Sequence, residues 1–206
     1  MRKTLLTGLA AGLCLAFMIG TANAVPVQWN AGAGANGHWY DLVDSTLSWT
    51  DAEVAAESAG GYLATITSAE EQAFVSSLLT SYVAGDNLNV TSGYMIGGFQ
   101  PAGSPEPGGN WQWVTPEVWN YEIWGTGEPN NLYGYENYLY MDERYGWEWN
   151  DYNNVNSFYG MAPETERWVG FSGYIVESEP VPEPATMLLL GTGLAFVAVI
   201  RIRRRK

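Results

Sequence analysis

Oxygen-bearing side chains gather in one stretch of the chain, residues 124–151, among glycines and aromatic residues. The hard cation Ca²⁺ takes about six to eight oxygen ligands from carboxylates, carbonyls and side-chain amides. Histidine and cysteine, which suit softer metals, do not occur in this stretch. We therefore expect a calcium site with the candidate ligands Glu128, Asn130, Glu136, Asn150 and Asp151.

The N-terminal residues 1–24 have the order of a secretory signal peptide. Arg2 and Lys3 precede a short apolar run, and Ala22-Asn23-Ala24 ends the segment with a small-residue cleavage site. A retained anchor helix is the alternative, but the run is short for one and is interrupted by glycines. This order predicts export and leaves residues 25–180 as the working domain.

The C-terminal residues 181–206 also have the order of a targeting segment. Val181-Pro182-Glu183-Pro184 is followed by an apolar stretch, 185–200, and by a basic tail, 201–206, the pattern of a membrane-spanning segment with a cytoplasmic end. The block resembles the PEP-CTERM sorting signal of Gram-negative bacteria. That resemblance implies cutting by an exosortase and a protein released or re-anchored at the cell surface, outer envelope or exopolysaccharide matrix. A plain membrane anchor is the alternative.

Charge and cysteine content narrow the function of the domain between these ends. Its length of about 155 residues is enough for one domain with a single core. It contains no cysteine, since Cys14 lies in the signal, so it must fold without disulfides. It holds 21 of the 22 acidic residues but only Arg144 and Arg167 of the nine basic ones, so its net charge is near −19. This charge argues against nucleic acid and anionic membrane surfaces as partners, and it suits cation binding.

Capping signals predict two helices in the first half of the domain. Thr50 with Glu53, and Ser68 with Glu71, each place a hydroxyl at a helix start and a glutamate three residues later. The first helix should end at Gly60-Gly61. Apolar and aromatic runs predict strands at 39–43, as an edge strand, and at 62–66, 94–98, 111–114 and 168–177. The result is an α+β domain in which a long segment, about 115–160, lacks helix or strand signals and is expected to be functional.

Catalysis is the least favoured reading of the acidic residues. Pairs such as Glu128 with Glu136, or Glu148 with Asp151, could serve glycoside hydrolysis as acid and nucleophile. The same residues are already candidate metal ligands, and a carboxylate bound to Ca²⁺ is a poor proton donor. His38, the only histidine, stands alone and supplies no nucleophile and base pair, so we expect a protein that is not an enzyme.

The motifs of the domain, taken in order, resemble the C-type lectin-like domain over about residues 38–178. The matching pieces are Trp49 with Ala52, and the runs 61–66, 94–98, 111–113, 128–130, 136–137, 149–151 and 174–177. The resemblance implies a C-type lectin-like fold, in which two helices flank antiparallel sheets and a long loop region holds Ca²⁺.

For the site, the resemblance implies that Glu128, Asn130, Glu136, Asn150 and Asp151 hold both the principal calcium and a sugar. Glu128-Pro129-Asn130 is similar to the mannose-type motif of the family, which has a cis bond before proline. Two neighbouring sugar hydroxyls would complete the calcium shell, donating to carboxylates and accepting from amides such as Asn130 or Asn150. Aromatic residues nearby can stack on a sugar ring or pack the core, and they include Trp124, Tyr133, Tyr135 and Trp147.

The chain departs from the family pattern at its half-cystine positions and in one insert. One pair of positions holds Ala56 and Val176, and the other holds Tyr138 and about Asn154, so apolar packing should hold the ends together. Near a second calcium position stand Gln100, Asn131 and Asn137 where carboxylates are expected, so we predict at most one strong ion. The insert at 152–173 could cover or extend the sugar site.

Two functions remain open on the sequence. The first is calcium-dependent, mannose-type carbohydrate binding by an exported bacterial protein. The second is a lectin-like module in which calcium only stiffens loops for a protein or matrix partner, because a fold does not decide a function.

Overall fold

The computed structural model describes residues 25–83, 90–91, 93–154, 159–162, 167–169 and 172–180. The expected signal peptide, the expected C-terminal membrane-spanning segment and much of the 152–173 insert lie outside the described residues. Within the described part, no helix is both long enough and apolar enough to cross a membrane.

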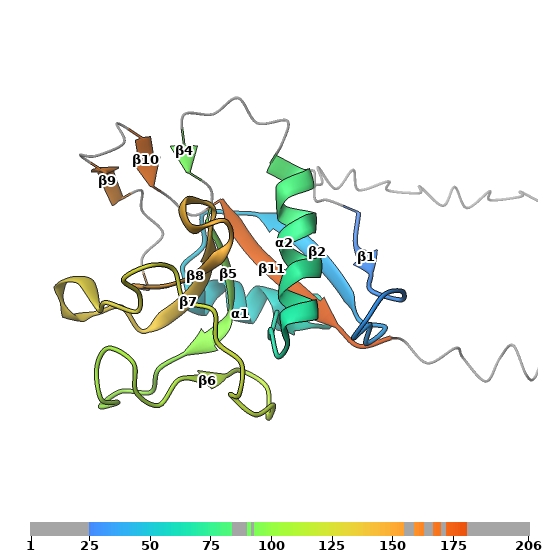
Figure 1. The fold of residues 1–206 in the computed structure, drawn as a ribbon, viewed down its shortest axis with the longest axis horizontal. Helices are drawn as coiled ribbons and strands as arrows, with labels where there is room; N and C mark the ends of the chain where they lie inside the picture. Colours follow the sequence, from blue (N-terminus) through green and yellow to red (C-terminus); the bar gives the residue numbers. More distant parts are fainter. Residues whose placement is uncertain are drawn as a thin grey trace, which may run out of the picture.

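One large sheet forms the centre of the domain (Figure 1). Its strand order is β1-β2-β11-β5-β7-β8, with β3 paired to β11 and β6 paired to β5. The strands are β1 Val27–Gln28, β2 Trp39–Asp44, β3 Tyr62–Leu63, β5 Gly93–Phe99, β6 Gln112–Trp113, β7 Tyr138–Asp142, β8 Glu148–Tyr152 and β11 Gly173–Ser178. The pairs in this sheet are antiparallel except β11 with β5, which run parallel. The sheet is therefore mixed, although the expectation was antiparallel.

A smaller sheet has the order β4-β10-β9. Its strands are β4 Val90–Thr91, β9 Tyr159–Ala162 and β10 Arg167–Val169. The strand predicted at 168–177 is thus divided between β10 and β11, which belong to different sheets. The strand predicted at 39–43 forms but is not an edge strand, because β1 pairs along its outer side, with Val27 opposite Tyr40.

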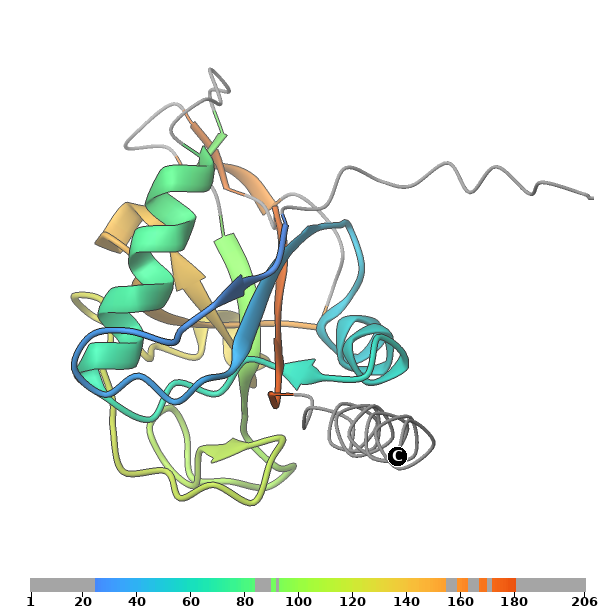
Figure 2. The same cartoon turned by 90° about the vertical axis from the view of Figure 1, so that its right-hand side faces the viewer.

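Two helices, α1 Trp49–Ser58 and α2 Ala69–Val83, lie on opposite sides of the large sheet (Figure 2). Trp49, Ala52 and Ala56 of α1 enter one buried cluster, together with Leu63, Met95, Tyr174 and Val176. Val75 and Leu79 of α2 enter the larger cluster, which includes Ile96, Leu139, Met141 and Ile175. The α+β expectation of two helices flanking sheets is confirmed.

The helix starts follow capping chemistry, with one shift. Ser48, not Thr50, caps α1, and its Oγ accepts the Asp51 N–H at 3.2 Å. Thr50 is not the cap, because the residue before it, Trp49, is already the first residue of the helix and is 3 % exposed. The cap position therefore falls on Ser48. Ser68 caps α2 as predicted, accepting the Glu71 N–H at 3.2 Å. The first helix ends as expected, because Gly60 adopts a φ of +86° after the cap residue Ala59.

Packing and one polar contact replace the family's cystines. Ala56 and Val176 lie in the same buried cluster, as expected for a pair that must meet without a disulfide. Tyr138 stacks obliquely on Trp49, with ring centroids 4.7 Å apart. Asn154 turns to the start of α1, where its Oδ1 accepts the Thr50 N–H at 3.1 Å. Apolar contacts therefore hold the chain together at Ala56 and Val176. At Tyr138 and Asn154, an aromatic contact and a hydrogen bond to α1 do so.

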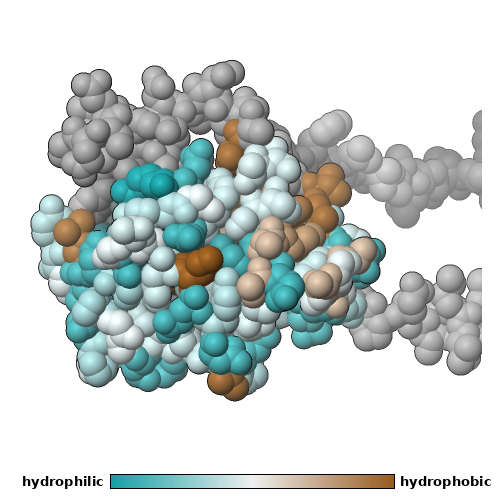
Figure 3. Space-filling view, in the orientation of Figure 1, coloured by the Kyte–Doolittle hydropathy of each residue, from teal (hydrophilic) through white to brown (hydrophobic). Residues whose placement is uncertain are grey.

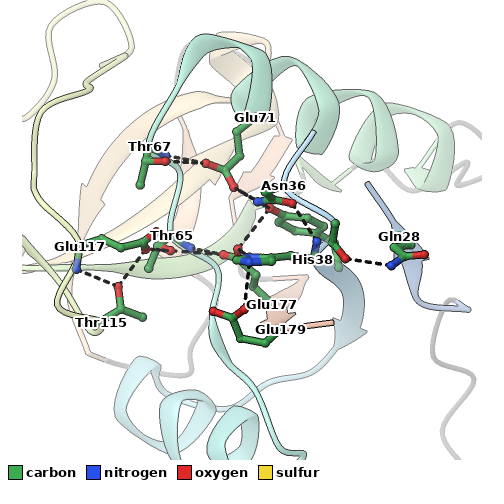
Figure 4. A network of polar contacts seen from close by, with 12 residues as sticks. Gln28, Asn36, His38, Thr65, Thr67, Glu71, Thr115, Glu117, Glu177 and Glu179 are labelled. Carbon is green, nitrogen blue, oxygen red and sulfur yellow. Dashed lines mark hydrogen bonds and ion pairs between the residues drawn. The ribbon is translucent and has the colours of Figure 1, made fainter. Parts of the chain in front are cut away.

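A network of buried acids joins α2, β2 and β11 (Figure 4). Tyr40 donates from its hydroxyl to Glu71 Oε1 at 2.5 Å and lies 3.2 Å from Glu177 Oε1. Glu71 and Glu177 are 3 % and 1 % exposed. Burial raises the pKa of Glu71, so in this network the carboxyl depends on nearby donors, among them the Thr67 N–H at 2.7 Å.

His38 belongs to the same network. Its Nδ1 lies 2.6 Å from Glu177 Oε1, and its Nε2 lies 3.3 Å from Glu179 Oε2 (Figure 4). The hydrogen bond to Glu177 raises the pKa of His38 against the opposing effect of burial. The histidine therefore sits at the edge of the core and has acidic partners, Glu177 and Glu179, that the sequence did not reveal.

Replacing Tyr40 by phenylalanine should lower the free energy of unfolding by about 1–3 kcal/mol, because the buried Glu71 carboxyl loses its hydroxyl donor. Urea unfolding followed by tryptophan fluorescence measures the change. The matched control is Tyr135→Phe, which removes the hydroxyl of a residue that is 55 % exposed. It should shift the free energy of unfolding by less than about 0.5 kcal/mol. Equal midpoints for the two variants would contradict the role assigned to the Tyr40 hydroxyl.

Candidate functional site

The β7–β8 hairpin and the loop before it carry the candidate ligands. Asn150 and Asp151 lie on β8, opposite Tyr140 and Leu139 of β7. The sequence did not predict this hairpin. Its residues are buried along nearly the whole length of both strands, so the alternation that marks a half-buried strand is missing.

The other edge of β8 is also held in place. The backbone of Trp149 exchanges hydrogen bonds with the preceding segment, donating to Ile123 O at 2.7 Å and accepting from the Gly125 N–H at 2.8 Å. Its indole Nε1 donates to Gln72 Oε1 of α2 at 2.9 Å. The strand is thus fixed on both sides before any ligand is considered.

A cluster of tryptophans packs behind this strand. Trp149 meets Trp113, Trp119 and Trp124 with ring centroids 5.5–5.9 Å apart, and Trp111 joins through Trp119 and Trp124. Trp124 was a candidate for sugar stacking, and it packs here instead. Trp147 is likewise 5 % exposed and part of the core. These rings order the segment that lacked recognisable elements in the sequence.

Asp151 ties the loop to the strand. Its residue is fully buried, and its two oxygens accept the Asn130 N–H at 2.9 Å and the Asn131 N–H at 2.7 Å. The Glu128–Pro129 bond just before is cis, as the resemblance implied. Burial raises the pKa of Asp151, while the two backbone donors oppose that rise. Asn130 itself joins the site through its backbone, and its residue is exposed.

Glu128 lies against Asp151 and keeps one oxygen free. Its Oε1 accepts from the Tyr145 hydroxyl at 2.9 Å, whereas its buried Oε2 has no hydrogen-bond partner. Burial raises the pKa of Glu128 to about 7, and the negative charge of Asp151 acts in the same direction. The buried Oε2 is therefore the atom of Glu128 that is free to take a ligand.

Glu136 closes the loop that begins at Asn131. It is 6 % exposed, its Oε2 accepts the Leu132 N–H at 2.6 Å, and its own N–H donates to Asn131 Oδ1 at 3.0 Å. Burial raises its pKa to about 8, and the charges of Asp151 and Glu128 contribute to the rise. The structure thus places all three carboxyls within electrostatic reach of one another.

Asn150 is oriented by residues that the sequence analysis missed. Its Nδ2 donates to the Tyr140 hydroxyl at 3.0 Å and lies 3.4 Å from Asp142 Oδ2. Arg144 donates to Asp142 Oδ2 at 2.5 Å and fixes that carboxylate. The amide nitrogen is engaged, whereas the buried Oδ1 of Asn150 has no hydrogen-bond partner. Only the cross-strand register, Tyr140 opposite Asn150, could have revealed this support.

The donor set suits a hard cation, although it is not a closed carboxylate cage. Among the residues that the structure describes, no group of three or more His, Cys, Asp or Glu side chains is arranged to hold a metal by itself. The candidate set has three carboxyls and two amides. Buried oxygens without partners, Glu128 Oε2 and Asn150 Oδ1, are the type of ligand that Ca²⁺ takes. On these atoms the residues fit calcium.

Another concave feature lies away from these residues. An apolar pocket of about 220 Å³ is lined by Val25, Val27, Tyr40, Leu42, Leu78, Ser81 and Tyr82. These residues belong to β1, β2 and α2, except Val25, which precedes β1. On the face seen in Figure 3, which is mainly hydrophilic, apolar side chains gather most visibly beside the N-terminal segment. None of the candidate ligands lines this pocket.

Two family models match the chain. The model described as "Lectin C-type domain" matches residues 45–160, and the PEP-CTERM protein-sorting motif matches residues 180–205. Similar proteins include lithostathine from Bos taurus, 35 % identical over 91 residues, which are 43 % of this chain and 49 % of that protein. A C-type lectin from Micrurus corallinus is 30 % identical over 129 residues, which are 61 % of this chain and 74 % of that protein. The chain thus spans about half the length of the lithostathine that it matches.

Solved structures share the fold at low identity. The C-type lectin CEL-I from Cucumaria echinata is 20 % identical with a TM-score of 0.52, covering 74 % of this chain and 96 % of that chain. A calcium-independent type II antifreeze protein is 19 % identical with a TM-score of 0.52, covering 78 % of this chain and 98 % of that chain. Several of the relatives are lectins by name, a class of binding proteins, which supports at the level of the family a protein that is not an enzyme. The chain belongs to the C-type lectin domain family and carries a C-terminal PEP-CTERM protein-sorting motif.

Proposed function

We propose that residues 25–180 form an exported domain that binds calcium and, through it, a neutral sugar of the mannose type. The observation that carries this proposal is the pair of neighbouring carboxyls, half-buried Glu128 and fully buried Asp151, in which the buried Oε2 of Glu128 lacks a hydrogen-bond partner. A divalent cation would satisfy that oxygen and offset the negative charges of the two carboxylates. The lectin relatives support a carbohydrate as the ligand.

Five residues would hold the ion: Glu128, Asn130, Glu136, Asn150 and Asp151. When bound, calcium would supply positive charge that draws in two sugar hydroxyls. Glu128 and Glu136 would accept hydrogen bonds from those hydroxyls. Asn130, which is exposed, remains able to donate an amide hydrogen. Asn150 differs from the expectation, because its nitrogen already donates to Tyr140 and only its oxygen is free for the ion.

We propose from the two ends of the chain that this domain works outside the cytoplasm. We propose that residues 1–24 act as a signal peptide and that residues 181–206 include a membrane-spanning stretch with a basic tail. The sorting motif at 180–205 supports export and processing by an exosortase. The product would be held at the cell surface, outer envelope or extracellular matrix of a Gram-negative bacterium.

A second function is open to the same fold, because a fold does not decide a function. The antifreeze protein with the same fold is described as calcium-independent, so the fold is not tied to sugar binding through calcium. In this alternative, calcium stiffens the loop between Glu128 and Glu136 for a protein or matrix partner, and no sugar binds. Calcium binding without any signal on a glycan array would favour it over the lectin function.

Thermal unfolding of the purified protein tests the proposal directly. In millimolar Ca²⁺ the midpoint should rise above that in chelator, because a ligand at about 100 times its Kd stabilises the folded state by roughly 2.7 kcal/mol. Adding α-methyl mannoside should raise it again. A rise with calcium alone would support the alternative, and no response to calcium would contradict both.

Glu128→Gln should weaken calcium and mannoside binding together, because the neutral side chain keeps its size but loses the charge that the ion requires. We expect at least a tenfold loss of calcium affinity, about 1.4 kcal/mol, by isothermal titration. Glu70→Gln, which neutralises an exposed carboxylate on α2, is the matched control and should bind as the wild type does. Unchanged calcium affinity in Glu128→Gln would remove this residue from the site.

Calcium affinity should rise with pH. The pKa values of Glu128 and Glu136, about 7 and about 8, stand above their ordinary value of 4.5, so the folded protein retains protons that the unfolded chain releases. Stability without metal should therefore fall as the pH rises from about 4.5 to about 8. Calcium must displace these protons, and about one to two should be released per ion near pH 6.5.

Titrations in two buffers of different ionisation enthalpy count the protons released. Glu136→Gln should release fewer protons than the wild type. Calcium affinity that stays constant between about pH 6 and pH 8.5 would contradict the assignment of these carboxyls to the site.

A further inference from the structure

An exposed aromatic pair stands on the loop that joins the candidate ligands. The loop includes a short 3₁₀ turn, η1 Leu132–Gly134, and projects from the body of the domain (Figure 1). Leu132, Tyr133 and Tyr135 are 48 %, 69 % and 55 % exposed. Neither tyrosine belongs to the two buried clusters of the described residues or packs against them. Their apolar surface therefore contributes nothing to the core.

The backbone holds these side chains outward in a defined shape. Tyr133 has a φ of +60°, and its neighbours Asn131 and Gly134 have φ values of +46° and +84°. A bulky residue in the left-handed region is disfavoured unless its surroundings impose it. Here they do, because the Gly134 N–H donates to Asn131 O at 2.8 Å and closes the turn.

The same turn is fastened to the candidate ligands at both of its ends. Asn131 donates its N–H to Asp151 Oδ2 at 2.7 Å, and Leu132 donates its N–H to Glu136 Oε2 at 2.6 Å. Glu136 in turn donates its N–H to Asn131 Oδ1 at 3.0 Å. Tyr133 directly follows Leu132, which contacts the proposed ligand Glu136, and Tyr135 directly precedes Glu136. Both tyrosines thus belong to a loop whose backbone is held by the proposed ligands Asp151 and Glu136.

The two rings together offer a surface wider than one ring. Their centroids are 6.4 Å apart and their planes are inclined by only 30°. A pyranose has faces of C–H groups that pack on aromatic faces, while the tyrosine hydroxyls remain in water. The ligand should be neutral, because the domain has a net charge near −19 and this loop, residues 130–136, contains no basic side chain.

We propose that Tyr133 and Tyr135 form a subsite for a second sugar residue, so that the protein prefers a neutral oligosaccharide or polysaccharide over a single sugar. This proposal rests on the proposed function, because it places the second residue next to a first one held at Glu128, Glu136 and Asp151. A single shallow site binds weakly, and a second contact on the same chain strengthens binding without a second protein.

The test compares a monosaccharide with an oligosaccharide on the calcium-loaded protein. The wild type should bind mannotriose about three- to tenfold more tightly than α-methyl mannoside, as expected for one added aromatic contact. The double variant Tyr133→Asn, Tyr135→Ala should lose most of that preference and keep its affinity for the monosaccharide. Asparagine is chosen at 133 because it tolerates the left-handed conformation. Tyr133→Phe, Tyr135→Phe should keep the preference, because the rings remain.

Two controls separate the possible outcomes. Val54→Ala, at an exposed apolar residue of α1, should change neither affinity, and equal calcium affinities will show that the double variant keeps its metal site. An unchanged preference in the double variant would overturn the subsite and leave the proposed function standing. No calcium-dependent binding of the monosaccharide to the wild type would overturn both. Tighter binding of a mannuronate trimer than of mannotriose, at equal free Ca²⁺, would contradict the proposal that the ligand is neutral.

Discussion

The carboxylate of Asp151 joins the two pieces of chain that make the candidate site. It lies on β8, fully buried, and its two oxygens accept backbone N–H groups from Asn130 and Asn131 in the loop after Pro129. A buried carboxylate without donors would cost several kcal/mol, so strand and loop are positioned together. The other candidate ligands take their places from this contact. Glu128 lies close enough for the charge of Asp151 to raise its pKa, and Glu136 closes the loop that Asp151 anchors.

The aromatic core makes this arrangement possible in a domain without cystines. Trp149, next to the two ligands of β8, contacts Trp113, Trp119 and Trp124 and bonds to Gln72 of α2. On the other side of the sheet, Ala56 and Val176 meet in a second buried cluster. Large rings bury much apolar area for little conformational entropy, so they can order long segments that other domains fasten covalently. The site is therefore built on a support that does not itself need the metal.

Acidic side chains lie inside the domain as well as on its surface. Glu71 and Glu177 are buried around the Tyr40 hydroxyl, with His38 as a cationic partner when protonated. No histidine accompanies the three carboxyls of the candidate calcium site, Glu128, Glu136 and Asp151. Burial raises the pKa of each of them. The first group has donors for its oxygens, whereas the second keeps an oxygen of Glu128 free. That difference separates the structural network from the candidate cation site.

The sequence by itself determined the α+β class, the two helices and the types of ligand atom in the loop. These features are local: Ser68 caps the helix that follows it, and Glu128-Pro129-Asn130 is contiguous. It did not reveal the β7–β8 hairpin, which is buried on both faces, or the bond between His38 and Glu177, 139 positions apart. Only the tertiary structure decided which ligand atoms are free. The nitrogen of Asn150 is taken by Tyr140 and its oxygen is left over, because hydrogen-bond partners are supplied by strands that meet only when the chain has folded.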